Sequence, residues 1–181
     1  MWRLGGGHFE LGYGYGFTGH TSPQYRGRGH KRPTCVGGTF LTYADLPQPV
    51  AMFNTGVDAN GTVLPNGAVD SHYPLTSIPT GGGADALVVT GNGLTNNSTS
   101  KWIGPADTNS TAGTYVYRMT FDLACTNNVT LSGRWAVDNS GRIFLNGNPN
   151  PVATINTTDQ SSFTTWHPFT ITSGFQVGQN Y

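Results

Sequence analysis

One-by-one alternation of apolar and polar residues in two adjacent stretches is the feature that most constrains the fold of this chain. In residues 115–123 and 129–137 the odd-numbered positions are apolar or aromatic except for Gly133, and the even-numbered positions are mostly polar. Successive side chains of a β-strand point to opposite faces, so a period of two predicts half-buried strands. A polar turn separates the stretches, and we expect them to be neighbouring antiparallel strands.

From about residue 39 onward the chain offers further short strands and no helical pattern. The 26 glycines and 11 prolines among 181 residues argue against a helical protein, because helix interiors tolerate neither residue well. The strand candidates are each flanked by Gly, Asn or Pro; they are residues 50–54, 73–78, 86–90, 142–145, 151–155 and 169–172. A total of about eight short strands favours an all-β fold, an antiparallel jelly-roll β-sandwich rather than a small barrel.

The beginning of the chain differs from the remainder in composition and charge. Residues 1–33 carry five basic residues and one acidic residue, whereas residues 34–181 carry four basic and eight acidic residues. A Gly-rich sequence buries few side chains, so residues 1–38 are predicted to be a disordered segment and residues 39–181 to form the β-sandwich domain. A leader ahead of the domain is favoured for this segment; a flexible linker and an RNA-binding tail based on its Arg-Gly-Arg-Gly run stay open.

Charge and cysteine content restrict the partners and the compartment. The acidic excess of the domain argues against a nucleic-acid or anionic-membrane surface there. No stretch approaches the roughly 20 apolar residues of a membrane span, and the N-terminus lacks the apolar core of a signal peptide. Only 10% of the residues are charged, which is typical of an extracellular or cell-envelope protein. Cys35 and Cys125 either form one disulfide or remain free thiols, and free thiols are favoured.

A family pattern is visible between residues 49 and 180. Its centre is Gly133-Arg134-Trp135-Ala136-Val137-Asp138-Asn139, followed by Phe144-Leu145-Asn146-Gly147, and residues 56–73, 100–103, 117–123 and 166–175 fit the same pattern. In these segments the chain resembles the galactose-binding-like jelly-roll domains of exported bacterial proteins, including many that carry a PEP-CTERM sorting tail. The resemblance implies a module that binds carbohydrate at the cell surface, with a structural calcium ion in many members.

The chain departs from this family pattern at its C-terminal end. Family members continue past the position of Asn180 with a further apolar strand, and the PEP-CTERM tail is absent. The last strand of the sandwich is therefore expected to be missing. An open sheet edge of this kind would allow copies of the chain to self-associate.

The residues of the domain do not fit the common catalytic patterns. Glycoside hydrolysis needs a pair of facing carboxylates, and the eight aspartates of the domain, which has no glutamate, lie mostly in turns or at outward strand positions. No Gly-x-Ser-x-Gly elbow occurs, and the triple glycine at 81–83 is not followed by the Lys-Ser/Thr of a phosphate loop. We therefore expect no enzymatic activity.

Candidate ligand-binding residues follow from sugar chemistry, which uses aromatic faces and a few directed polar groups. Trp102 and Trp166 lie beside polar, loop-like stretches and each either packs at a strand end or offers a ring to a ligand. His72 and Tyr73 are further candidates, with the alternative that they are half-buried residues at the start of a strand. Asp138 and Asn139, in a predicted turn, complete the set of candidate binding residues. Trp135 is assigned to the core because it lies on the apolar face of its strand.

Calcium binding and three function classes complete the expectations. Asp58-Ala59-Asn60-Gly61 offers oxygen ligands, with Asp70 and Asp138 as further donors, but a plain Asx turn is the favoured alternative and no cofactor is expected. The leading function is a non-catalytic carbohydrate-binding or adhesion module. The alternatives are a structural or self-assembling matrix protein and an accessory domain of a larger secreted glycoside hydrolase.

Overall fold

The all-β expectation is confirmed by the architecture of the chain. The computed structural model describes residues 7–15, 52–91, 93–105, 111–124, 126–127, 129–156 and 159–181. Within these ranges the regular elements are short and long β-strands, together with a single four-residue helix, α1 (Ser161–Thr164). The high glycine and proline content favours the frequent turns between strands, and the described ranges contain no longer helix.

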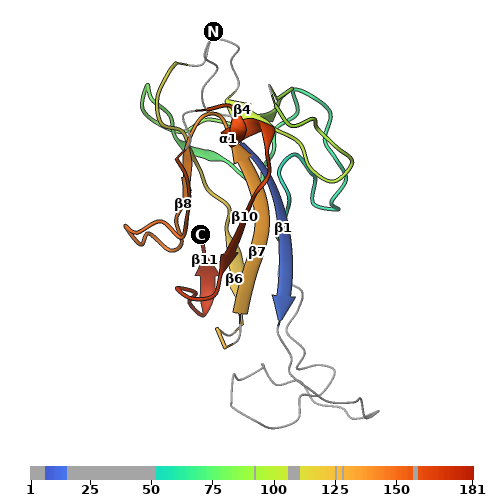
Figure 1. Cartoon of the computed structure of the whole chain (residues 1–181). Helices are drawn as coiled ribbons and strands as arrows, with labels where there is room; N and C mark the ends of the chain where they lie inside the picture. Colours follow the sequence, from blue (N-terminus) through green and yellow to red (C-terminus); the bar gives the residue numbers. More distant parts are fainter. Residues whose placement is uncertain are drawn as a thin grey trace.

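The largest element of the fold is an antiparallel five-stranded sheet built around one long strand. Across the sheet the strands are β10 (His167–Ile171), β7 (Val129–Val137), β1 (Gly7–Tyr15), β4 (Ile103–Pro105) and β3 (Ala86–Val88). Figure 1 shows β10, β7 and β1 side by side along the sheet, with α1 near one end of β7. Segments from both ends of the chain therefore meet on β7.

The strand β7 covers the second alternating stretch with the predicted bounds. The first stretch, in contrast, is divided into β5 (Val116–Tyr117) and β6 (Phe121–Leu123). β5 pairs with β2 (Leu75–Ser77), and β6 pairs with β11 (Gly178–Asn180), so the expectation that residues 115–123 lie beside residues 129–137 is wrong. A period of two determines which face of a strand is buried, but it leaves the choice of partner strand open.

A strand also forms where the sequence predicted disorder. All nine residues of β1, Gly7–Tyr15, pair in antiparallel register with β7, from Gly7 opposite Val137 to Tyr15 opposite Val129. A strand therefore lies at residues 7–15 of the segment that the sequence predicted to be disordered, and residues 1–6 and 16–38 lie outside the described part. The prediction of disorder considered only how few side chains a Gly-rich segment can bury. In the structure, the hydrogen-bond ladder with β7 satisfies the backbone N–H and C=O groups of β1.

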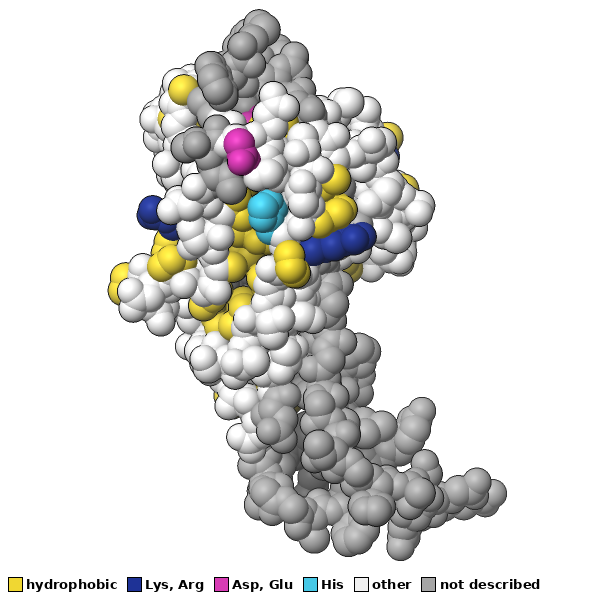
Figure 2. Space-filling view, in the orientation of Figure 1, with side chains coloured by type: hydrophobic (Ala, Val, Ile, Leu, Met, Phe, Trp, Pro, Cys, Tyr) yellow, Lys and Arg dark blue, Asp and Glu magenta, His cyan; other side chains and the backbone are white. Residues whose placement is uncertain are grey.

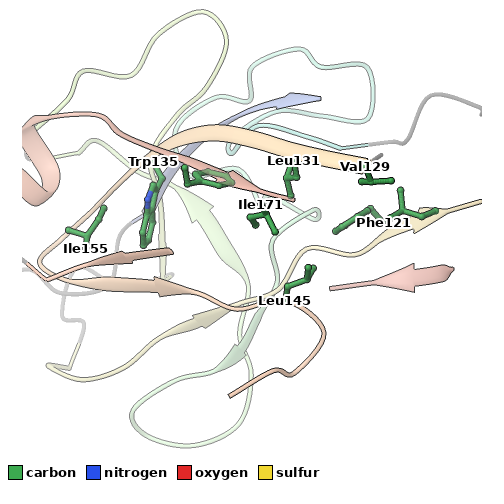
Figure 3. Close-up of a cluster of buried hydrophobic side chains, with 9 residues drawn as sticks. Phe121, Val129, Leu131, Trp135, Leu145, Ile155 and Ile171 are labelled. Carbon is green, nitrogen blue, oxygen red and sulfur yellow. The ribbon is translucent and has the colours of Figure 1, made fainter. Parts of the chain in front are cut away.

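The main hydrophobic core lies between the large sheet and several two-stranded sheets. β8 (Gly141–Ile143) pairs with β9 (Ala153–Ile155) to form one of them. Buried side chains from β7 and β10 meet those of β6, β9 and the loop after β8 in this cluster (Figure 3). The cluster comprises Phe121, Leu123, Val129, Leu131, Trp135, Leu145, Ile155, Phe169 and Ile171.

A second, smaller core cluster lies toward the other end of the fold. Tyr73, Leu75, Ala86 and Ile103 are buried together there, and Met119 packs against both clusters. Of the weaker strand predictions, residues 52–54 form no strand, while the candidates at 73–78, 86–90, 142–145, 151–155 and 169–172 each overlap an observed one. Near the C-terminal end, residues 178–180 are paired as β11 with β6, and Tyr181 follows the strand.

Candidate functional site

A surface pocket of about 200 Å³ lies beside the link between β5 and β6. This link, residues 118–120, belongs to no strand, and the Arg118 backbone N–H donates to the Pro74 carbonyl at 3.1 Å. The interruption of the alternating stretch therefore brings its polar residues against the chain that precedes β2. The pocket is lined by Phe53, Ser71, His72, Pro74, Arg118, Met119 and Thr120.

His72 and Phe53 form a stacked pair in the wall of this pocket. Their ring centroids are 3.7 Å apart and the planes are inclined by 16°. The His72 Nδ1 atom lies 3.1 Å from the Val57 carbonyl oxygen, which can only accept a hydrogen bond. We therefore assign the proton of the neutral ring to Nδ1, which leaves Nε2 as the hydrogen-bond acceptor.

Asp70 is the buried residue that holds His72 in place. Its side chain is completely buried. One carboxylate oxygen accepts from the Gly56 N–H at 2.7 Å, and the other accepts from the His72 N–H at 3.0 Å and lies 3.5 Å from His72 Nδ1. Burial raises the pKa of this carboxyl, and the hydrogen bonds from Gly56 and His72 oppose that shift.

Gly56, which donates to Asp70, tolerates no side chain at its position. Its φ of +72° lies in the left-handed region, and an added Cβ would be 2.6 Å from the Cβ of Lys101. Both the conformation and the close approach require glycine. The buried carboxylate thus ties the turn at Gly56 to the pocket residue His72, and Gly56 itself lies close against Lys101.

Tyr73 lies behind the pocket rather than in it. The side chain is only 5% exposed, and its hydroxyl donates to the Phe53 carbonyl at 2.6 Å. Burial also raises the pKa of this phenol, with a smaller contribution from the charge of Asp70. Tyr73 therefore holds the backbone of Phe53, and its ring is packed inside the fold rather than exposed in the pocket.

Arg118 contributes a cationic group to the pocket. Its guanidinium carbon lies 4.7 Å from the centroid of the Tyr181 ring, a cation–π geometry. In the part of the chain that the structure describes, no carboxylate lies within 4.0 Å of this guanidinium. The pocket wall therefore carries a positive charge that contacts an aromatic ring and that forms no ion pair with a described carboxylate.

Trp102 is enclosed in the fold and is not a ligand platform. The residue is 2% exposed, and its indole N–H donates to the Leu94 carbonyl at 2.6 Å. Its backbone N–H donates to the Asn96 side-chain oxygen at 2.7 Å, and the ring packs over Gly91. Of the two alternatives for Trp102, the structure shows packing, with the ring enclosed between Gly91 and the Leu94 carbonyl.

The remaining predicted residues lie away from the pocket lining. Trp166 is half-buried just before β10, with the Arg134 guanidinium 4.6 Å from its ring centroid. Asp138 and Asn139 follow the end of β7 and are also half-buried. Of the six predicted binding residues, the pocket lining contains only His72. No local sequence signal joins it to Phe53 and Arg118, because the three residues are distant in the chain.

The calcium candidate at Asp58 has the geometry of an Asx turn. One oxygen of the Asp58 carboxylate accepts from the Asn60 and Thr62 N–H groups, both at 2.8 Å. The hydrogen bonds from Thr62 and Asn60 lower the pKa of this exposed carboxyl. Elsewhere in the described ranges, no group of three His, Cys, Asp or Glu side chains is placed to share a metal ion.

The surface around the sites is poor in charge. Figure 2 shows few charged side chains on the face in view, separated by hydrophobic and uncharged polar groups. Among the described residues, no helix has the length and apolar character needed to cross a membrane.

The two cysteines, Cys35 and Cys125, lie outside the described residues, and so does any bond between them.

Comparison with protein-family models, with curated proteins and with solved structures found no match for this chain. The geometry of the pocket is therefore the basis on which a function is argued.

Proposed function

We propose that this protein is a non-catalytic carbohydrate-binding module of an exported cell-surface protein, and that its ligand occupies the pocket at Phe53, His72 and Arg118. The observation that carries the proposal is the combination of a stacked aromatic pair with polar side chains in one concave site. Sugar rings present C–H groups that pack on aromatic planes and hydroxyl groups that need directed hydrogen bonds. The pocket supplies both kinds of contact.

Each part of the pocket has a role in such a complex. The rings of Phe53 and His72 and the side chains of Pro74 and Met119 provide the apolar wall. The Ser71 and Thr120 hydroxyls can both donate and accept, as sugar hydroxyls require. Two hydrogen bonds behind the pocket keep the wall in place before a ligand binds: the Tyr73 hydroxyl donates to the Phe53 carbonyl, and the His72 N–H donates to the Asp70 carboxylate. Preorganisation of this kind lowers the entropic cost of binding.

The lining favours binding over hydrolysis. A glycosidase of the common type places two carboxyl groups on opposite sides of the scissile bond. The described lining contains no carboxylate, because Asp70 is completely buried behind His72. We accordingly propose a module that recognises its ligand without cleaving it.

The finer fold assignment belongs to the same proposal. A jelly-roll β-sandwich of the galactose-binding-like kind is supported by the antiparallel pairing throughout and by a core that lies between a large sheet and several smaller ones. Fold similarity alone would not establish a ligand, so the proposed binding rests on the lining of the pocket.

A glycan-array screen of the full chain, followed by calorimetric titration of the glycans that bind, tests the proposed function. Replacing Phe53 with Ala removes the apolar wall and is expected to weaken binding at least tenfold, the loss that about 1.4 kcal/mol produces. Phe144→Ala is the matched control, because Phe144 is 45% exposed and does not line the pocket.

Two results would contradict the proposal. Absence of binding to every glycan, with and without calcium, would refute carbohydrate recognition, and concentration-dependent oligomers in that same sample would favour the self-assembling matrix protein instead. Equal weakening by Phe53→Ala and Phe144→Ala would show that the pocket is not the binding site.

A further inference from the structure

We propose that the pocket selects acidic sugars, and that Arg118 binds the carboxylate of a uronic acid residue. The inference rests on the proposed function and adds the chemical class of the ligand. Its starting point is the charge of the lining: Arg118 is the one permanently charged residue among the seven that line the pocket. A neutral sugar would leave this cation without a counter-charge.

The guanidinium of Arg118 is positioned to receive a carboxylate. The backbone is fixed by the hydrogen bond from Arg118 N–H to the Pro74 carbonyl, and the side chain is fixed by the Tyr181 ring. A guanidinium carries five N–H donors, and the cation–π contact with the single Tyr181 ring does not occupy them all. The Arg118 guanidinium therefore retains donors for a bidentate pair with a carboxylate.

The buried acidic group behind His72 forms no ion pair with this cation. Asp70 is completely buried, does not line the pocket, and lies on the Nδ1 side of His72. Its two oxygens already accept hydrogen bonds from the Gly56 and His72 N–H groups. The Asp70 oxygens are thus engaged behind His72, and the charged group that lines the pocket is the guanidinium of Arg118.

The other polar groups of the lining suit the remainder of a uronic acid. The carboxylate of such a sugar projects from one edge of the ring, and hydroxyl groups project from the others. With the carboxylate at Arg118, the Ser71 and Thr120 hydroxyls remain for the sugar hydroxyls, and the Phe53–His72 pair remains for the ring. One sugar residue can thereby use the charged, polar and apolar parts of the pocket together.

Calorimetric titration with matched sugars tests the inference. The pairs are methyl galactoside with galacturonic acid and methyl glucoside with glucuronic acid, which differ mainly at the carboxylate. We expect one of the acids to bind at least tenfold more tightly than its neutral partner, the size of a charge-assisted hydrogen bond. Arg118→Gln should remove that difference, whereas Arg142→Gln, at an exposed arginine of β8 outside the lining, should retain it.

The outcomes separate the inference from the proposed function. Equal binding of neutral and acidic sugars at the pocket would overturn the acidic selectivity and leave carbohydrate binding intact. Absence of binding to any glycan would overturn both. An acid preference that survives Arg118→Gln would also contradict the role of Arg118. If that variant does not fold, the comparison of matched sugars on the unmodified chain still decides the selectivity.

Discussion

Substitution of Gly91 by Ala tests whether Trp102 is enclosed as the structure shows. A Cβ added at Gly91 would lie 2.1 Å from Cδ1 and 2.2 Å from Nε1 of the Trp102 indole. Carbon atoms in contact are normally about 3.5–4.0 Å apart, so the ring would have to move by about 1.5 Å. The φ of Gly91 lies outside the left-handed region, and backbone strain therefore contributes nothing to the expected effect.

The magnitude follows from what the indole would lose. Overpacking a closed core costs about 1–3 kcal/mol. Displacement also breaks the hydrogen bond from Nε1 to the Leu94 carbonyl, and a buried donor left unpaired costs about 1–3 kcal/mol. Gly91→Ala should therefore lower the free energy of unfolding by about 2–6 kcal/mol. In a Trp102→Ala background the clash is absent, so the additional cost of Gly91→Ala should fall to within about 1 kcal/mol of zero.

Urea denaturation followed by circular dichroism would measure all four members of this double-mutant cycle. Gly104→Ala is the matched control, because an added Cβ there would lie 3.4 Å from a Val89 methyl group, an ordinary contact. The reasoning is refuted if Gly91→Ala is as mild as Gly104→Ala, or if the costs of Gly91→Ala and Trp102→Ala simply add. Either result would mean that the indole has space to move and that Trp102 is not locked in the fold.

Three further predictions concern buried and turn polar groups. Burial raises the pKa of Asp70, so its contribution to the free energy of unfolding grows as pH falls from the raised pKa toward the ordinary aspartate range. The stability of the unmodified chain relative to Asp70→Asn should therefore increase between pH 7 and pH 4, and a decrease would contradict the shift. Asn180 is completely buried, accepts hydrogen bonds from the Gln176 N–H and the Asn146 amide, and donates to two carbonyls. Asn180→Ala should therefore lower the free energy of unfolding, measured by urea denaturation, by about 2–3 kcal/mol, and a loss below about 0.5 kcal/mol would refute this. Turn hydrogen bonds lower the pKa of Asp58, so the stability that this carboxylate contributes to the fold is present above the ordinary aspartate range and is lost as pH falls through the lowered pKa. Asp58→Ala should therefore be destabilising at pH 7 and neutral near pH 2. An effect that is the same at both pH values would argue against the turn hydrogen bonds.

The pocket residues show why the site was only partly predicted. His72 was singled out as an aromatic group that a sugar could use, and it lines the pocket. Phe53 and Arg118 were not, because the first was placed in a strand candidate, residues 50–54, and the second lies on the polar face of an alternating stretch. Trp102 was assigned to binding because its neighbours are polar, but those polar groups instead hold the buried ring through Leu94 and Asn96.

The strand β1 marks the same division within the fold. Its sequence alternates Phe9, Leu11, Tyr13 and Tyr15 with His, Glu and Gly residues, a period-two signal that its glycine content obscured. Even with that signal recognised, its place beside β7 would not have followed, because β1 and β7 are separated by more than a hundred residues. Antiparallel ladders are built from backbone groups that are nearly equivalent in every strand.

Local sequence patterns were sufficient to predict the all-β class, the bounds of β7 and the buried face of each alternating stretch, because side-chain alternation is a local property of the extended chain. They could not predict the partners of β5, β6 and β7, the enclosure of Trp102 or the meeting of Phe53, His72 and Arg118 in one pocket. These features depend on contacts between distant segments. They arise when the whole chain satisfies its backbone hydrogen bonds and fills its core together.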